Sequence, residues 1–269
     1  MSHNIALLGI GDDSHSSFLR GAAKAPAIIR DSLFSPASNS FSELGINVLS
    51  EELLTDLGDL SFSESIDPII QIEEKITDTL EQGYKPISIG GDHAVTYPIV
   101  KALSKNYPSF NILHFDAHPD LYDEFEGDRY SHACPFARIM ELGRVNRLVQ
   151  VGIRTLNDHQ REQVARFGVE CYDMISLGQQ PLRLQLSGPL YISIDMDCLD
   201  PAFAPGVSHR EPGGMSSREV IAILHQLAQQ DIELIGADVV EYNPDRDMDG
   251  VTSVVAAKLL KELIALAVQ

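Results

Sequence analysis

The chain has 269 residues, with 20 Lys or Arg against 39 Asp or Glu, so its formal net charge is −19 at pH 7. This charge disfavours binding to the phosphates of nucleic acids, and it favours cationic small molecules or metal ions as partners. Hydrophobic residues make up 44% of the chain, enough for a sizeable core, yet no apolar run approaches the length of a membrane span.

The cysteines and the N-terminal residues bear on location. Cys134, Cys171 and Cys198 are too few and too scattered for a disulfide framework or a thiolate zinc site, which fits a reducing compartment. The first residues do not combine a basic segment with a long apolar stretch. The sequence therefore predicts a cytoplasmic protein that binds neither nucleic acid nor membranes.

Short apolar segments alternate with segments of helical periodicity along the chain. The apolar segments predict strands at 5–9, 86–89, 111–115, 148–153, 169–172, 190–194 and 232–240. Helical spacing and capping signals predict helices at 26–33, 66–80, 97–104, 136–142, 158–167, 216–229 and 253–268. Residues 35–59 show no clear pattern. This alternation predicts an α/β fold with three layers, α/β/α, around a mostly parallel sheet, in one domain covering 1–269.

The stretch 111–120, NILHFDAHPD, ends an apolar run in Asp116, His118 and Asp120. Alternate residues of an extended chain point to the same side, so the side chains of Asp116 and His118 are expected to emerge together. Taken alone, these are equally compatible with solvated loop residues.

Polar residues follow three further predicted strands in the same way. His93 follows the strand at 86–89, Asp195 and Asp197 follow the strand at 190–194, and Glu241 follows the strand at 232–240. In a parallel sheet, active sites form beyond the carboxyl ends of the strands, which all lie at one edge. The four polar clusters therefore predict one site.

Four carboxylates brought together repel one another unless positive charge compensates them. The charges of Asp116, Asp120, Asp195 and Asp197 would be balanced by two divalent cations, with His93 and His118 as neutral imidazole ligands. An oxygen-rich set with no thiolate favours manganese, while cobalt, nickel and iron stay open. Two metals about 3.5–4 Å apart lower the pKa of a water molecule held between them, which predicts hydrolytic chemistry.

These residues resemble the ureohydrolase family, which includes arginases and agmatinases. The matching motifs occur in family order: GGDH (90–93), DAHPD (116–120), SIDMDCLDP (193–201) and VEYNP (240–244). The similarity covers essentially the whole chain and is greatest to plant-type arginases, through segments such as SSFLRG, DLYDEFEGDRYSHACPFARI and FAPGVSHREPGG.

The resemblance implies a metal centre of two Mn²⁺ ions per chain. One ion would be held by His93, Asp116, Asp120 and Asp195, and the other by Asp116, His118, Asp195 and Asp197, so that Asp116 and Asp195 bridge them. The resemblance further implies that hydroxide generated at the metals attacks a guanidinium carbon, giving urea and an amine. It also implies assembly into homo-trimers or homo-hexamers.

Three residues receive catalytic roles from the same resemblance. Asp120 would help to move a proton to the leaving amine, and His132 matches the family's general acid or proton shuttle. Glu241 would pair with the substrate guanidinium and orient its carbon.

The identity of the guanidino substrate is the open question. Asn157 falls near the position where animal-type arginases have an aspartate that holds the α-amine, and Asp128 stands where the plant-type FEGN pattern has asparagine. A carboxylate at Asp128 would repel the α-carboxylate of arginine and suit the ammonium group of agmatine. Whole-chain similarity favours L-arginine. The first predicted reaction is therefore hydrolysis of L-arginine to L-ornithine and urea, and the second is hydrolysis of agmatine. Guanidinobutyrate, a single-zinc deacetylase and a catalytically silent metal-binding relative are further alternatives.

Overall fold

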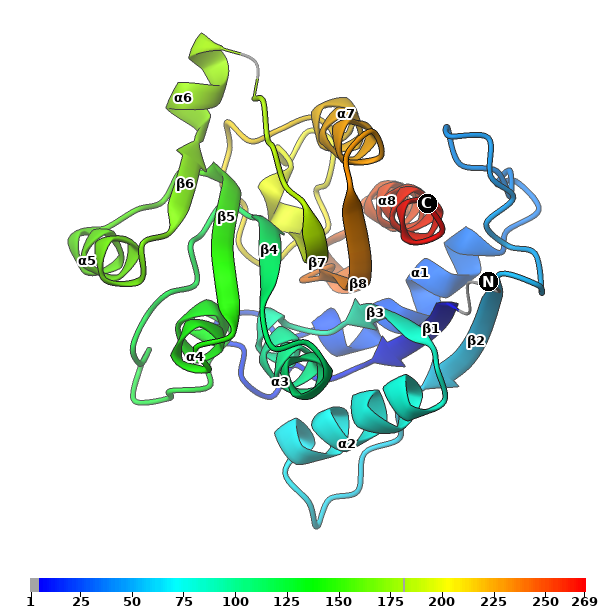
Figure 1. The fold of residues 1–269 in the computed structure, drawn as a ribbon, viewed down its shortest axis with the longest axis horizontal. Helices are drawn as coiled ribbons and strands as arrows, with labels where there is room; N and C mark the ends of the chain where they lie inside the picture. The colour runs from blue at the N-terminus through cyan, green and yellow to red at the C-terminus, as the bar shows by residue number, and fades with distance from the viewer. Residues whose placement is uncertain (1–4, 181) are drawn as a thin grey trace.

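The structure, a computed structural model, describes residues 5–180 and 182–269. Its strands form one eight-stranded sheet with the order β2-β1-β3-β8-β7-β4-β5-β6, and every pair of neighbours is parallel (Figure 1). The strands are β1 (Ile5–Ile10), β2 (Leu54–Asp59), β3 (Lys85–Gly90), β4 (Phe110–Phe115), β5 (Val145–Ile153), β6 (Glu170–Asp173), β7 (Gly188–Asp195) and β8 (Ile232–Val240). The predicted α/β fold with a parallel sheet is confirmed.

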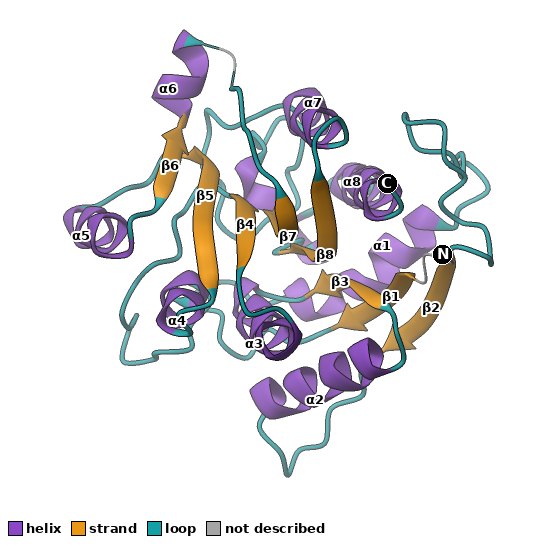
Figure 2. Ribbon diagram, in the orientation of Figure 1, coloured by secondary structure: helices purple, strands orange, loops and turns teal. Residues whose placement is uncertain are grey.

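Helices cover both faces of this sheet (Figure 2). The α-helices are α1 (Ala25–Leu33), α2 (Pro68–Glu81), α3 (Thr96–Asn106), α4 (Pro135–Glu141), α5 (Asp158–Phe167), α6 (Met174–Gln179), α7 (Ser217–Leu227) and α8 (Val251–Ala267). Short 3-10 helices are η1 (Ala22–Lys24), η2 (His93–Val95), η3 (Met196–Cys198) and η4 (Pro244–Arg246). Within the described ranges, no helix is both long enough and apolar enough to cross a membrane.

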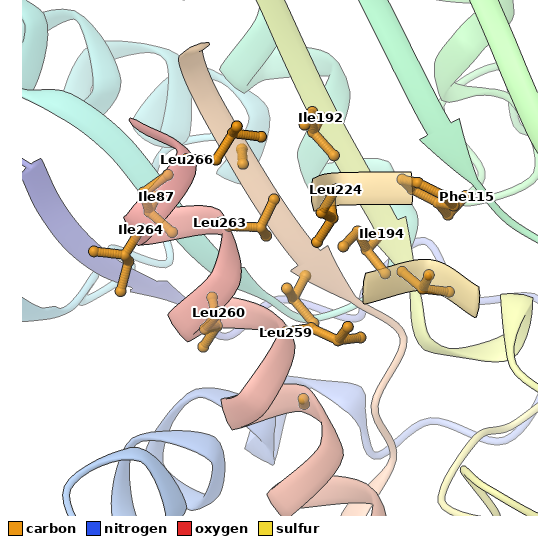
Figure 3. Close-up of a cluster of buried hydrophobic side chains, with 14 of the residues drawn as sticks. Ile87, Phe115, Ile192, Ile194, Leu224, Leu259, Leu260, Leu263, Ile264 and Leu266 are labelled. Carbon is orange, nitrogen blue, oxygen red and sulfur yellow. The ribbon is translucent and has the colours of Figure 1, made fainter. Parts of the chain in front are cut away.

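Two hydrophobic clusters fill the spaces between the sheet and its helices. One joins α1, α7 and α8 to the sheet, and the other joins α2, α3 and α4 to the opposite face. In the first, Leu260 and Leu263 of α8 belong to the same cluster as Ile87 of β3 and Ile192 of β7 (Figure 3). Because both faces are covered, the central strands are buried at successive residues instead of at alternate ones.

Local signals in the sequence account for several helix ends. The side chain of Asn157 accepts a hydrogen bond from the backbone N–H of Gln160 and caps α5, whose carboxyl end is closed by Gly168 at φ 64°. Ser216 and Glu219 form the predicted capping box of α7.

Two elements were not predicted from the sequence. The edge strand β2 lies in the segment that showed no clear pattern. Most of its residues are not fully buried, so the strand has no apolar run, and its position is set by parallel pairing with β1. The short helix α6 has no buried residue and therefore no apolar period, and it begins where Asp173 accepts a hydrogen bond from the N–H of Ser176.

The strand order brings together the four strands that precede the polar clusters. β3, β8, β7 and β4 are consecutive neighbours at the centre of the sheet. Since these strands are parallel, the residues that follow them meet at one edge.

Candidate active site

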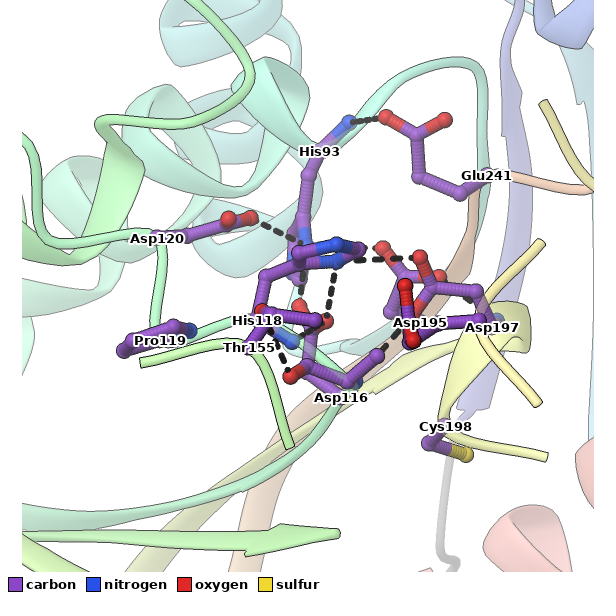
Figure 4. A network of polar contacts seen from close by, with 12 residues as sticks. His93, Asp116, His118, Pro119, Asp120, Thr155, Asp195, Asp197, Cys198 and Glu241 are labelled. Carbon is purple, nitrogen blue, oxygen red and sulfur yellow. Dashed lines mark hydrogen bonds and ion pairs between the residues drawn. The ribbon is translucent and has the colours of Figure 1, made fainter. Parts of the chain in front are cut away.

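His93 stands at the centre of a first group of potential ligands. Its Nδ1 atom lies 3.2 Å from Asp116 Oδ2, 3.0 Å from Asp120 Oδ2 and 3.2 Å from Asp195 Oδ2 (Figure 4). All four residues are buried, and one ligand atom from each lies within 4.8 Å of the others, close enough to hold one metal ion.

A second group shares Asp116 with the first. His118 Nδ1 lies 3.3 Å from Asp116 Oδ1 and 3.1 Å from Asp197 Oδ2, and these three residues form another cluster able to hold a metal. Asp195 adjoins this cluster because its Oδ1 accepts a hydrogen bond of 2.7 Å from the Asp197 N–H. All six residues expected as ligands therefore converge, while bridging by Asp195 stays a prediction.

The hydrogen bonds of His93 test whether a cation fits between these groups. The Ser193 hydroxyl donates to Asp238 Oδ1 at 2.6 Å, so its oxygen accepts the Nε2–H of His93 at 3.0 Å. In the neutral imidazole, Nδ1 is then an unprotonated acceptor, and it has no hydrogen-bond partner within the described part of the chain. A lone pair facing three carboxylates is unfavourable unless a cation lies between them, so these residues fit a metal.

The electrostatics indicate the same demand for positive charge. Burial raises the pKa of Asp195 well above its usual range, and the charges of Asp197 and Asp116 raise it further. Burial alone would lower the pKa of His93, but the carboxylates of Asp116, Asp120 and Asp195 beside its ring outweigh burial and raise it well above its usual range. A metal ion would replace the proton that these groups otherwise share.

Residues behind the ligands hold them in place. Gln150 donates to His114 Nδ1 at 3.0 Å, which leaves the Nε2–H of His114 to donate to Asp116 Oδ2 at 2.8 Å. Asp238 accepts hydroxyl donors from Ser193, Thr96 and Tyr191 at 2.6, 2.7 and 2.6 Å. We assigned no role to these residues from the sequence, although His114 shares the two-residue period of Asp116 and His118.

Glu241 and His132 form a pair beside the first group. Glu241 adopts φ 63° after β8, and its Oε1 accepts hydrogen bonds from the His93 N–H at 2.9 Å and from His132 Nδ1 at 2.8 Å. Although burial opposes protonation of His132, the charge and hydrogen bond of Glu241 raise the pKa of His132 to about 9. His132 is therefore an imidazolium ion near neutral pH, held by a carboxylate.

A cavity of about 250 Å³ opens onto these groups. It is lined by Ser17, His118, Asp120, Tyr122, Phe125, His132, Ala133, Thr155, Gln160, Asp195, Asp197, His209 and Glu241. The four carboxylates among them make the cavity suitable for a cationic ligand. Ser17 and His209 were not expected there, because they lie far from the four polar clusters in sequence.

The two residues expected to contact the far end of the substrate are not among those lining residues. Asp128 Oδ2 pairs with His15 Nδ1 at 2.7 Å, and its Oδ1 accepts the N–H of Tyr130. Asn157 caps α5 and donates to the Tyr122 hydroxyl at 2.5 Å. Contact of either residue with substrate stays a prediction.

The model of the Arginase family matches residues 3–265. The chain belongs to the arginase family. Arginase 1, mitochondrial, of Arabidopsis thaliana is 48% identical over 277 residues, covering 97% of this chain and 80% of the relative. Agmatinase of Bacillus subtilis (strain 168) is 33% identical over 245 residues, covering 87% and 84%. The solved structure of arginase from Medicago truncatula matches with a TM-score of 0.92 at 42% identity, covering 99% of this chain and 88% of that chain.

Membership of the arginase family confirms two predictions and overturns a third. The predicted resemblance to ureohydrolases and the prediction of a metal-dependent hydrolase of guanidino compounds are both confirmed. The predicted cytoplasmic location is wrong: similar arginases of Arabidopsis thaliana, Oryza sativa and Medicago truncatula are named mitochondrial or chloroplastic/mitochondrial. Few and scattered cysteines indicate only a reducing compartment, so they could not single out the cytosol.

Proposed function

We propose that this arginase-family protein hydrolyses L-arginine to L-ornithine and urea, with two Mn²⁺ ions per chain. The observation that carries the proposal is the Nδ1 of His93, which faces three carboxylates at 3.0–3.2 Å in a buried cluster able to hold a metal ion. Glu241, which accepts the N–H of the same histidine, lines the adjoining cavity. A cation site and a carboxylate for a guanidinium ion thus lie side by side.

The metal ligands are assigned as the sequence implies. His93, Asp116, Asp120 and Asp195 would hold one ion, and Asp116, His118, Asp195 and Asp197 the other. The absence of thiolate from this set supports manganese. Bound there, the metals would supply Lewis-acid activation of water near neutral pH.

The protein's own residues bind the substrate and move protons. The carboxylate of Glu241 would pair with the guanidinium group, and its two hydrogen bonds, from His93 and His132, fix its orientation toward the metal ligands. Asp120, which also lines the cavity, would carry a proton toward the leaving amine. His132, protonated at neutral pH, would supply the proton that the free amine needs.

Agmatine is the second candidate substrate. No Lys or Arg is present among the described residues that line the cavity, and both ring nitrogens of the His132 imidazolium are already engaged, so an α-carboxylate would depend on neutral donors such as Thr155 and Gln160. Against agmatine, the Asp128 carboxylate that would have favoured an ammonium group is already engaged by His15 Nδ1 at 2.7 Å and by the N–H of Tyr130. This pairing supports arginine.

The test is urea release by manganese-loaded protein with L-arginine, agmatine and 4-guanidinobutyrate in parallel, comparing kcat/KM. We expect the largest value for L-arginine. Preference for agmatine would overturn the substrate assignment, and no urea from any of them would overturn the function. Asp128→Asn is a matched variant: because His15 and the Tyr130 N–H already engage the Asp128 carboxylate, we expect an unchanged ratio of kcat/KM for arginine to that for agmatine.

Two predictions about organisation accompany this function. We propose that residues 1–269 form one domain, which the mixing of strands from both halves of the chain in one sheet supports. We also propose a homo-trimer or homo-hexamer, which light scattering of the purified protein would test.

A further inference from the structure

The loop between β1 and α1 reaches across to the candidate active site. Ser17 in this loop lines the cavity, and its Oγ lies 2.8 Å from His132 Nε2 although 115 residues separate the two in sequence. Both ring nitrogens of His132 are therefore engaged, Nδ1 by Glu241 and Nε2 by Ser17.

The direction of these hydrogen bonds follows from the groups involved. A carboxylate only accepts, so Nδ1 of His132 carries a hydrogen toward Glu241. With the pKa of His132 raised to about 9, Nε2 is protonated as well near neutral pH and donates to Ser17 Oγ. The hydroxyl hydrogen of Ser17 is then free, because Ser17 Oγ makes no other hydrogen bond within the described ranges. That hydrogen is available to a ligand in the cavity.

The loop keeps its place through contacts that do not involve the Ser17 side chain. The N–H of His132 donates to His15 O at 3.2 Å, and His15 Nδ1 pairs with Asp128. Ser16 donates to Asp92 Oδ2 at 3.0 Å. Removal of the Ser17 hydroxyl alone is therefore not expected to release the loop.

We propose that the Ser17 hydroxyl relays a proton from His132 to the leaving nitrogen of the guanidino substrate, a role that rests on the proposed hydrolysis. Water supplies the oxygen bound by the guanidinium carbon, and the broken C–N bond leaves its electron pair on nitrogen. That nitrogen takes the hydroxyl proton of Ser17, while Ser17 Oγ takes the Nε2 proton of His132. Asp120 passes one proton of the water to the same nitrogen and the other water proton is released to solvent, so the products are urea, a protonated amine, an intact serine and a neutral imidazole, which solvent reprotonates.

The test compares Ser17→Ala with Ser17→Thr, which keeps a hydroxyl, and with Ser14→Ala as the control. Ser14 lies in the same loop, but its hydroxyl bonds to Asp12. We expect Ser17→Ala to lower kcat about 10–100-fold while KM and bound manganese stay unchanged. Ser17→Thr should restore most of kcat, and Ser14→Ala should behave as wild type. A plot of kcat against the fraction of D2O in the solvent should be curved in wild type, where two protons move in one step, and linear in Ser17→Ala.

Other results would overturn the relay. One is an unchanged kcat in Ser17→Ala. Another is that Ser17→Ala loses bound manganese, or has a raised KM that Ser17→Thr does not return to the wild-type value, because these changes would indicate a structural role. If wild-type protein released no urea from any of the three guanidino compounds, the proposed function would fall together with the relay. Activity in wild type with full activity in Ser17→Ala would overturn the relay alone.

Discussion

Replacing Ser193 by alanine would remove the hydroxyl that joins His93 to Asp238. Ser193 Oγ accepts from His93 Nε2 at 3.0 Å and donates to Asp238 Oδ1 at 2.6 Å, and all three residues are fully buried. A buried hydrogen bond to a charged group contributes about 1.5–3 kcal/mol, and a buried donor left unpaired costs about 1–3 kcal/mol. We expect the free energy of unfolding to fall by about 3–5 kcal/mol.

The same substitution should weaken metal binding. Because the hydrogen bond at Nε2 orients the ring whose Nδ1 faces the carboxylates, we expect the affinity for Mn²⁺ to fall about 10–100-fold. Calorimetric titration of chelator-treated protein measures this affinity, and urea unfolding measures the stability.

A neighbouring strand offers a matched control. Ser88 on β3 and Ser193 on β7 are both in register with Asp238 on β8, and Ser88 is also fully buried. Its Oγ has no hydrogen-bond partner within the described ranges, so Ser88→Ala should leave the Mn²⁺ affinity unchanged. Equal affinities in Ser88→Ala and Ser193→Ala would refute the idea that Ser193 orients His93.

Three further outcomes follow from the site. Asp197→Ala should bind one metal fewer per chain and lose nearly all turnover, as measured by metal analysis and urea release; full turnover would contradict the mechanism. Glu241→Gln should keep its metals and lose about 100-fold in kcat/KM, or about 3 kcal/mol, and an unchanged kcat/KM would show that Glu241 is not the guanidinium partner. In metal-free protein, the free energy of unfolding of wild type should exceed that of His132→Asn. Since folding raises the pKa of His132, this difference should be fully present below pH 6.5 and lost as pH rises through about 9. Urea unfolding across this range measures it, and a pH-independent difference would contradict the ion pair with Glu241.

The strands and most helices were predictable because their signals are local. An apolar run ended by Gly or Asp specifies a buried strand, and the box of Ser216 and Glu219 specifies where α7 begins. β2 was missed because an edge strand that is half exposed has little apolar pattern of its own. Its place depends on backbone pairing with β1.

The metal ligands were predictable for a related reason. Parallel strands place their carboxyl ends at one edge, so Asp116, Asp195 and Glu241 were expected at that edge once the sheet was inferred, and the strand order then made them neighbours. The residues that orient them were not predictable, because nothing near Ser193 or His114 in the sequence specifies which side chain lies opposite. The sequence also counted Asp128 as an unpaired charge, whereas the structure pairs it with His15, 113 residues away.

Sequence alone determined the α/β class, the family and the six residues that converge as candidate ligands, since these depend on period, spacing and motif. Tertiary structure alone decided the partner of His93 Nε2, the partner of Asp128 and the approach of Ser17 to His132. Each of these depends on side chains that meet only after distant segments fold together. The donor–acceptor distance of a hydrogen bond can vary by only about 0.5 Å. No local sequence pattern specifies the distance between remote residues to that precision.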